Sequence, residues 1–317
     1  MRFALMTEPQ QGLSYDEVLA LARTAEEAGF ESFFRSDHYT SFPGDSELPT
    51  TDAWTTLAGV ARETTRIGIG VLVSPVTFRL PGNLAKVITT VAEMSGGRVE
   101  AGVGAGWNAL EHRRHGLAFP PPAERFDMLE EQLAILHGLW TEPDGWSFSG
   151  RHWQVSDAHY YPKPAAPPGR RHPNLIIGGK GGPRMARLVA RYADEFNRSS
   201  ATPDAVRGAF GRVRAACEGE GRDPAEVTLS AMTGVLVGRN QREIDDRTAD
   251  LLRMVGASGS DADAWLEERS RRWIFGTPDQ ARQRVADLDA AGTQRVMLQT
   301  FVPRDLEMVR LLGEIFL

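Results

Sequence analysis

The chain lacks the marks of a secreted or membrane-spanning protein. It has one cysteine, Cys217, in 317 residues, so no internal disulfide can form and a reducing compartment suits it. No apolar run approaches the roughly 20 residues that a membrane span requires. The apolar run in the N-terminal stretch MRFALMTEPQ is also much shorter than the core of a signal peptide. We therefore expect a cytoplasmic protein that does not enter a membrane.

The chain also lacks blocks of charge of one sign. Its 36 Lys and Arg residues and 42 Asp and Glu residues are mixed along the sequence and give a net charge of −6. A nucleic-acid-binding surface needs a basic stripe to neutralise phosphates, and none is visible. The apolar and charged fractions, 41% and 25%, are ordinary for a globular protein. We therefore expect a small-molecule partner and no nucleic acid.

What the chain does have is a regular alternation of short apolar runs and amphipathic stretches. The apolar runs predict strands within 2–6, 31–36, 66–73, 97–103, 174–179, 194–199, 226–238 and the last part of 277–300. The amphipathic stretches predict helices within 14–30, 51–64, 81–95, 124–140, 183–193, 202–219 and the first part of 277–300. Eight strands that alternate with helices predict a closed (β/α)8 TIM barrel, an α/β fold, as a single domain over 1–317.

Two segments exceed what a plain barrel needs. Residues 141–173 are rich in proline and aromatics, and WSFSGRHWQV within them predicts a hairpin about Gly150 and Arg151. Residues 239–276 hold extra helical material. Because long insertions on a barrel usually shape the rim of its active site, we expect both on the C-terminal face. There the aromatics of 141–173 would form a lid over a substrate.

An acid and an imidazole follow the second predicted strand, in ESFFRSDHYTSF. The functional groups of a barrel gather at the C-terminal ends of its strands, so Asp37 and His38 lie on the expected catalytic face. Strand alternation directs Phe34, Ser36 and His38 to one side and Asp37 to the other, so Asp37 is not expected to orient His38. A packed or exposed histidine without a catalytic role is the alternative.

A glycine-rich loop, IIGGKGGP, follows the fifth predicted strand and opens a helix. Its glycines Gly178, Gly179, Gly181 and Gly182 allow close approach of a ligand, and the helix N-terminus and Lys180 supply positive charge. This combination predicts a phosphate site, although a tight turn without a ligand is the alternative. It is not a Walker motif, which requires Ser or Thr after GK.

The stretch GAGWNA (104–109) fits a dinucleotide-binding pattern, but its surroundings do not. The acid expected about 20 residues later falls in an amphipathic helix rather than at the end of a strand. The glycines could instead let backbone N–H groups reach a flat ring walled by Trp107, or form a turn without a ligand. In EHRRH, His112 and His115 lack further metal ligands at a recognisable spacing, so we expect a solvated helix start and no metal.

Taken together, these stretches resemble one family, the bacterial-luciferase-like barrel oxidoreductases, in the branch that uses the deazaflavin coenzyme F420. The matching stretches, in family order between residues 3 and 300, are FRSDHY, VSPVTFR, GGRVEAGVGAGWN, YYPKP, LIIGGKGGP, YADEFN, GTPDQ and RVMLQ. The resemblance implies that Asp37 and His38 lie near the reactive carbon of the deazaflavin, with His38 moving the proton. It also implies a substrate side formed by Phe42, Trp107 and Ser199.

The remaining implied cofactor contacts lie on three loops. A non-proline cis peptide at Gly70 and Val71 would support the back of the ring together with Val73, and Ser74–Pro75 is the competing cis bond from the residues alone. Gly106, Trp107 and Asn108 would contact the edge of the deazaflavin ring at its pyrimidine end. Gly178, Gly179, Lys180, Gly181 and Gly182 would hold the cofactor phosphate.

The implied activity is hydride transfer between F420 and a small organic substrate such as a ketone or alcohol, an imine or an unsaturated carbonyl. RSSAT after YADEFN lacks the lysine of a sugar-phosphate site, which argues against glucose 6-phosphate. The alternatives are an FMN-dependent monooxygenase with a partner reductase, a non-catalytic flavin-binding protein and a phosphate-binding isomerase barrel. Family analogy implies a homodimer.

Overall fold

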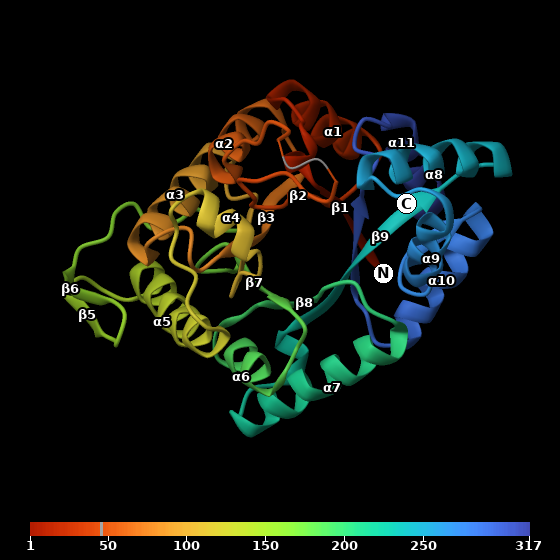
Figure 1. The fold of residues 1–317 in the computed structure, drawn as a ribbon. Coiled ribbons are helices and arrows are strands. Elements are labelled where there is room, and N and C mark those ends of the chain that lie inside the picture. Colours follow the sequence, from red (N-terminus) through yellow and green to blue (C-terminus); the bar gives the residue numbers. More distant parts are fainter. Residues whose placement is uncertain (45–46) are drawn as a thin grey trace.

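Eight parallel strands form a closed barrel in the computed structural model, which describes residues 1–44 and 47–317 (Figure 1). The barrel closes because β9 pairs in parallel with both β8 and β11. The predicted TIM barrel is thus confirmed. Its strands are β1 (Arg2–Thr7), β2 (Ser32–Arg35), β3 (Gly68–Pro75), β4 (Val99–Gly104), β7 (Asn174–Gly179), β8 (Glu195–Arg198), β9 (Thr228–Val237) and β11 (Arg295–Thr300).

Helices surround the barrel as the amphipathic stretches predict. They are α1 (Tyr15–Glu27), α2 (Ala53–Glu63), α3 (Pro81–Met94), α5 (Pro122–Thr141), α6 (Pro183–Tyr192), α7 (Pro203–Gly219), α10 (Pro278–Ala290) and α11 (Leu306–Phe316), with short turns η1 (Pro9–Gln11) and η2 (Pro224–Glu226). The capping box of Ser14 and Glu17 forms at the start of α1. Helix α11 was not predicted, whereas the short α4 (Ala109–Arg114) lies where a helix start was expected, at EHRRH. No helix in the described part of the chain has the length and apolarity that crossing a membrane requires.

The barrel interior is filled in layers, because alternate residues of each strand point inward. A middle layer of buried apolar side chains consists of Ala4, Met6, Phe34, Leu72, Ile176 and Met297. Below it, at the N-terminal ends of the strands, Arg295 and its partners close the barrel. Above it the inward positions become small or polar, and this change leaves room for a ligand.

The lower layer is an ion network around the guanidinium of Arg295. Its Nη1 donates to Glu100 at 2.7 Å and to Glu195 at 3.0 Å, and its Nε faces Glu31. Asn174 donates to both Glu100 and Glu195. Burial lowers the pKa of Arg295, but the three carboxylates outweigh it and raise that pKa above its ordinary value. This network ties β4, β8 and β11 together and shuts one end of the barrel.

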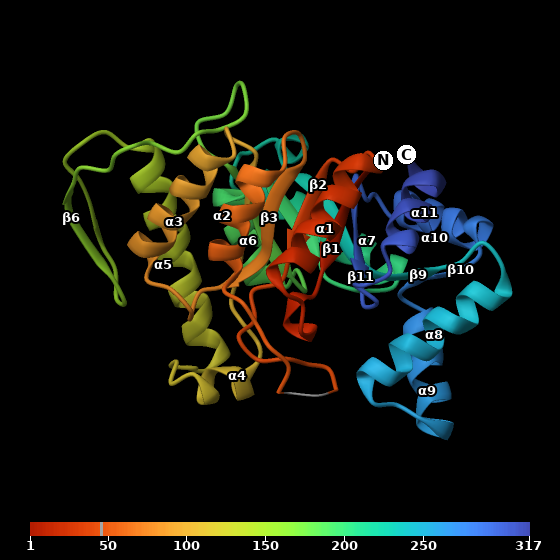
Figure 2. The ribbon, with the colours of Figure 1, turned by 90° about the horizontal axis from the view of Figure 1, so that it is seen from above.

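The two insertions lie at opposite ends, which corrects the prediction for 141–173. The insertion 239–276 forms α8 (Gln241–Val255), α9 (Gly259–Ser270) and β10 (Ile274–Gly276). Helices α8 and α9 lie at the same end of the molecule as α4, on the C-terminal side (Figure 2). The segment 141–173 instead connects α5 to the start of β7. Its residues 166–168 and 170 line a cleft with residues at the starts of β1, β2 and β9. A connection from helix to strand returns to the N-terminal face, so it cannot form a lid at the other end.

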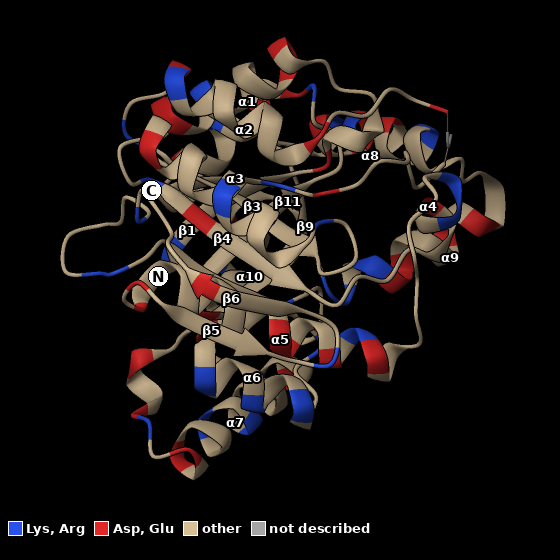
Figure 3. Cartoon of the chain, turned by 90° about the vertical axis from the view of Figure 1, so that its left-hand side faces the viewer, with Lys and Arg blue, Asp and Glu red and all other residues tan. Residues whose placement is uncertain are grey.

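The hairpin predicted within 141–173 is nevertheless present. Strands β5 (Trp146–Ser149) and β6 (Gln154–Ala158) pair antiparallel on the outside of α5, on the face seen in Figure 3, where acidic and basic residues are interspersed. Trp146 lies against Gly138, where a Cβ would stand 2.2 Å from the indole ring. The Glu131 carboxylate accepts the backbone N–H groups of the hairpin turn, residues 151–153. The hairpin aromatics thus pack on helices rather than on a substrate.

A non-proline cis peptide lies in β3, but two residues beyond the predicted position. It joins Leu72 to Val73, and the pairing of β3 with β4 shifts register between Val71 and Ser74. Gly70–Val71 and Ser74–Pro75 are not among the cis bonds of the described backbone. Both sequence-based positions are therefore wrong, and the cis bond lies within the irregular part of this strand.

Replacing Arg295 tests the closing network. We expect Arg295→Met to lower the free energy of unfolding by about 3–5 kcal/mol, because it leaves Glu100 and Glu195 buried without a counter-charge. The control is Arg282→Met, which removes an exposed pair with Asp279 and should cost less than about 1 kcal/mol. Urea unfolding followed by circular dichroism measures both, and equal small losses would contradict the assignment.

Candidate active site

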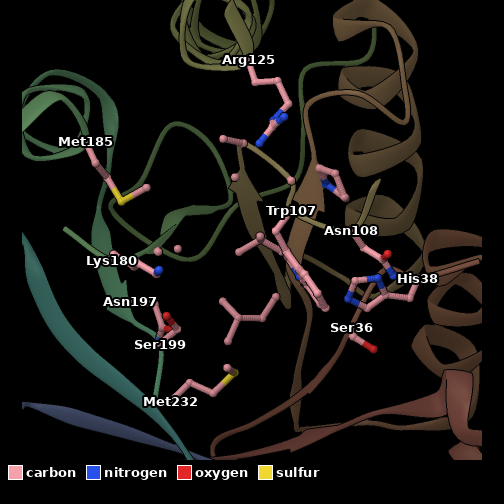
Figure 4. A pocket seen from close by; sticks show the side chains of 18 of the residues that line it. Ser36, His38, Trp107, Asn108, Arg125, Lys180, Met185, Asn197, Ser199 and Met232 are labelled. Carbon is pink, nitrogen blue, oxygen red and sulfur yellow. The ribbon is translucent and has the colours of Figure 1, made fainter. Parts of the chain in front are cut away.

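A cavity of about 710 Å³ opens at the C-terminal ends of the barrel strands (Figure 4). Its wall is mostly apolar and comes from loops that are far apart in the sequence. The predicted site residues that line it are His38, Phe42, Val73, Gly106, Trp107, Asn108, Gly178, Gly179, Lys180, Gly181, Gly182 and Ser199. Asp37, Gly70 and Val71 are not among the lining residues. The fold therefore brings most of the predicted set into one cavity.

The imidazole of His38 is held from one side and open on the other. Its Nδ1 lies 3.0 Å from Oε1 of Glu111, and its side chain is 12% exposed. A carboxylate can only accept a hydrogen bond, so Nδ1 carries the proton and the second ring nitrogen, Nε2, is left as the acceptor. Phe42 packs edge-on against the imidazole with ring centroids 4.5 Å apart. The arrangement suits a group that exchanges a proton with a ligand.

Glu111 is the functional residue that the sequence reasoning missed. Its side chain is buried and also accepts the backbone N–H groups of Tyr39 and Thr40, so it fixes the loop after β2 as well as His38. The expectation of a solvated helix start is wrong for Glu111 and His112, both 1% exposed. The inner side of α4 packs against loops that follow β2 and β3. A charged residue three positions after a helix-capping asparagine, Asn108, was the available signal.

Asp37 faces away from the cavity, as strand alternation predicts. Its carboxylate accepts from Nη1 of Arg79 at 2.5 Å and from the Ser74 hydroxyl at 3.0 Å. Arg79 also pairs with Asp52; burial raises the pKa of Asp52, but the arginine outweighs it and lowers that pKa to about 2. These charged groups tie the loop after β3 to the loop after β2. Asp37 therefore lies behind the cavity wall. It does not line the cavity, where the expected contact with the cofactor would be made.

The side chain of Val73 forms the floor of the cavity and packs against three glycines, Gly102, Gly104 and Gly178. A Cβ on Gly104 would lie 2.7 Å from Val73 Cγ2, and a Cβ on Gly178 would lie 2.6 Å from Val73 Cγ1. A Cβ on Gly102 would lie 2.2 Å from the backbone oxygen of Val71. Side chains at these positions would push Val73 into the cavity. The glycines thus create a shallow apolar bed on which a flat ring can lie.

Gly70 and Val71 do not reach this bed. Val71 is fully buried in the main core outside the barrel lumen. A Cβ on Gly70 would lie 2.5 Å from the ring of Phe34, so this glycine makes room for the apolar layer below the cavity. The bulge re-aims the chain only beyond Val71, which brings Leu72 and Val73 to the cavity in their place.

Positive charge gathers at the end of the cavity formed by the loop after β7. Lys180 is exposed there, and no described acid forms an ion pair with it. Helix α6 begins at Pro183 without a side-chain cap, so its first N–H groups are open to a ligand. Gly181, at φ +67°, is held by a hydrogen bond from Arg212 Nε to its carbonyl at 2.8 Å. These groups suit a phosphate.

A polar wall contributed by β1, β2 and β11 was also missed by sequence reasoning. The Glu8 carboxylate accepts from the side-chain amides of Gln10, at 2.6 Å, and Gln299. Ser36 donates to the other end of Gln10 at 2.6 Å. Glu8, Ser36 and Gln299 all line the cavity. Since these donors are already used, the groups left for a ligand are mainly acceptors.

A closed parallel barrel with a ligand cavity at the strand C-termini defines the class of this protein. The chain belongs to the luciferase-like monooxygenase family, whose family model matches residues 1–295.

Relatives within this family include coenzyme F420-dependent enzymes. The chain is 35% identical over 198 residues to an F420-dependent glucose-6-phosphate dehydrogenase of Nakamurella multipartita, which is 62% of this chain and 55% of that protein. The match therefore spans little more than half of that relative. The fold is similar to an F420-dependent secondary alcohol dehydrogenase in complex with an F420–acetone adduct (TM-score 0.84, 20% identity, 99% and 98% of the two chains).

The fold is equally similar to a monooxygenase of Streptomyces bottropensis (TM-score 0.82, 21% identity, 100% and 98% of the two chains). At these identities the solved structures establish the fold and leave the chemistry to the residues of the site.

The glycine bed yields a test by a single added methyl group. We expect Gly178→Ala to lower the free energy of unfolding by about 1–3 kcal/mol, because the new Cβ overlaps Val73. Gly211→Ala, in an open position within α7, should instead stabilise by about 0.5–1 kcal/mol through helix propensity. Denaturant unfolding of both variants measures the contrast, and a neutral Gly178→Ala would refute the close packing.

Proposed function

We propose that this protein is an F420-dependent oxidoreductase that transfers a hydride between the deazaflavin and a small organic substrate. The observation that carries the proposal is the His38–Glu111 pair, which opens onto a cavity with a glycine-backed floor. The F420-dependent relatives of the same family add support.

The residues present fit the cofactor. The bed formed by Leu72, Val73 and the glycines beneath it accepts a flat ring from one side. Trp107, 65% exposed, stands at the rim with its ring centroid 5.8 Å from that of His38. Lys180 and the open N-terminus of α6 would hold the phosphate.

The deazaflavin, when bound, supplies a ring carbon that accepts or donates a hydride, with carbon in place of the reactive flavin nitrogen. The protein has then to orient the substrate and manage one proton. In the direction of alcohol oxidation, His38 Nε2 takes the proton from the hydroxyl oxygen as the hydride leaves the adjacent carbon. Glu111 keeps Nδ1 protonated and stabilises the imidazolium that forms.

The substrate compartment combines aromatic edges with acceptor groups. Phe42 and Trp107 meet edge to face with centroids 5.2 Å apart beside His38, which limits access of water. Glu8 and Ser36 offer acceptors to a hydroxyl or amine of the substrate. An alcohol and its ketone, an amine and its imine, or an unsaturated carbonyl fit these surroundings. A homodimer in the cytoplasm completes the proposal by family analogy.

An FMN-dependent monooxygenase is the second candidate, favoured by the family description and the fold of the Streptomyces enzyme. The same bed and phosphate groups would accept FMN. Native mass spectrometry after incubation with F420 and FMN together separates the two functions and also gives the subunit number. We expect F420 to be retained; retention of FMN alone, with substrate-dependent oxygen consumption, would favour the monooxygenase.

Variants of the histidine pair test the proton role. Among ketones, alcohols, imines and unsaturated carbonyls, a screen that follows the absorbance of F420 identifies a substrate of the wild type. With it, His38→Ala should lower turnover by about 100-fold or more while F420 binding is retained. Glu111→Gln should cause a smaller loss, about 10-fold, because the amide still accepts from Nδ1 but carries no charge.

Glu131→Gln is the matched control for the second variant. Glu131 also accepts several backbone N–H groups, but it lies on the outer face of α5, against the hairpin. Turnover of Glu131→Gln should equal that of the wild type. Undiminished turnover of His38→Ala would remove the assigned role of His38 and leave F420 binding intact.

A further inference from the structure

Arg125, on the first turns of α5, is a buried guanidinium that lines the cavity and that the proposed chemistry does not use. Its residue is 8% exposed. Its Nη1 donates to the carbonyl of Pro120 at 2.6 Å, and its Cζ lies 3.9 Å from the ring centroid of Phe119. Its Nε has no hydrogen-bond partner among the described residues. In Figure 4 the side chain reaches from α5 toward the cavity.

Other buried arginines of the described chain have their charge or their donors satisfied. Arg295 faces three glutamates, and Arg247 pairs with Asp305 and Glu243. Arg35 has no acid in direct contact, but each of its three nitrogens donates to an oxygen of residues 36, 51 or 52. No carboxylate of residues 1–44 or 47–317 forms an ion pair with Arg125. Its charge and part of its donor capacity are therefore left for something else.

Burial without a counter-charge is unfavourable for a guanidinium, and here burial lowers the pKa of Arg125. Burial of the guanidinium becomes favourable when a ligand places an anion beside it. A planar guanidinium matches the oxygens of carboxylate and phosphate groups, which it can bind through two parallel N–H donors.

The position of Arg125 indicates which part of a ligand would meet it. It lies on the helix between β4 and β7 and lines the same cavity as Lys180 and the first turn of α6. In Figure 4 it stands at the end of the cavity away from Ser36 and Met232. The substrate-side acceptor Ser36 is thus remote from it in this view. An anion at Arg125 would belong to the cofactor rather than to the reacting substrate.

We propose that Arg125 is an oxyanion subsite for the acidic tail of the deazaflavin coenzyme, an inference that rests on the proposed function. In F420 the phosphate is followed by a lactyl group and glutamyl residues, which carry carboxylates, whereas FMN ends at its phosphate. The shared chemistry is an oxyanion held by the guanidinium, and it comes from the phospholactyl group or from the glutamyl carboxylates. If the glutamyl carboxylates supply it, Arg125 would favour F420 over a flavin that lacks this tail.

A purely structural role of Arg125 predicts a different pattern of affinities among forms of the cofactor. Through Pro120 and Phe119, Arg125 also holds the loop that leads into α5. If it did only this, its loss would weaken binding of every form of the cofactor alike, including the form without a tail. Affinities for forms of different tail length therefore separate the two roles.

The experiment titrates three forms of the deazaflavin into the purified protein and follows fluorescence quenching. The forms are the ribityl chromophore without phosphate, the phospholactyl form without glutamates, and the full glutamylated coenzyme. The variants are Arg125→Gln and Arg125→Lys, the second retaining the charge and most of the packing volume. Arg113→Gln, an exposed charge on α4, controls for a general change in net charge. Circular dichroism melting checks that each variant is folded.

We expect Arg125→Gln to bind the glutamylated coenzyme at least 10-fold more weakly and the phosphate-free chromophore within two-fold of the wild type. Arg125→Lys should lie between, and Arg113→Gln should match the wild type. If Arg125→Gln also loses affinity for the phospholactyl form, the oxyanion belongs to the phospholactyl group. If it loses affinity only for the glutamylated form, the oxyanion belongs to the glutamates.

Equal losses for all three forms, or no loss, would overturn the subsite and leave the proposed function standing. Wild-type protein that binds none of the three forms would overturn the proposed function itself, and the subsite with it.

Discussion

The site depends on how a closed barrel is filled. Every barrel strand is paired on both sides, so the lumen can be filled only by the side chains that the strands direct inward. Here the Arg295 network closes the lower end, and six apolar side chains around Phe34 and Ile176 fill the middle. Above that level the inward positions of β4 and β7 are glycines, and Val73 occupies the space they leave. The cavity exists because no large side chains fill the lumen above this level. Its floor is supported by the apolar layer directly beneath it.

Charge in and around the cavity is divided among groups with different partners. Asp37 is neutralised by Arg79 behind the site, while Glu111 is held by His38 and two backbone N–H groups. Glu8 relies on neutral amides alone. Arg125 and Lys180 meet no acid among the described residues. The negative groups thus lie on the loops after β1 and β4, and the unpaired positive groups lie on α5 and the loop after β7. This division is consistent with an uncharged reacting centre at one end of the cavity and an anionic group at the other.

Sequence reasoning succeeded where a local pattern dictates a local structure and failed where distant contacts decide. The barrel strands and the hairpin about Gly150 both follow from patterns a few residues long. The placement of 141–173 was wrong because the composition of a segment does not tell which end of the barrel it returns to. The cis bond was expected at Gly70–Val71 because the family resemblance implied it there, yet it joins Leu72 to Val73. Space for Val73 is provided by Gly104 and Gly178 on other strands.

By itself the sequence determined the order of strands and helices, the glycine-rich loop at 178–182 and the inward direction of His38, because alternation and capping are properties of neighbouring residues. Only the tertiary structure decided which groups accompany that histidine. Glu111 lies 73 positions away, and Asp37, its immediate neighbour, faces Arg79 instead. The reason is geometric: adjacent side chains on an extended strand point apart, whereas the strand ends of a closed barrel converge. Partners in the site therefore come from separate loops, and no spacing within the chain reveals them.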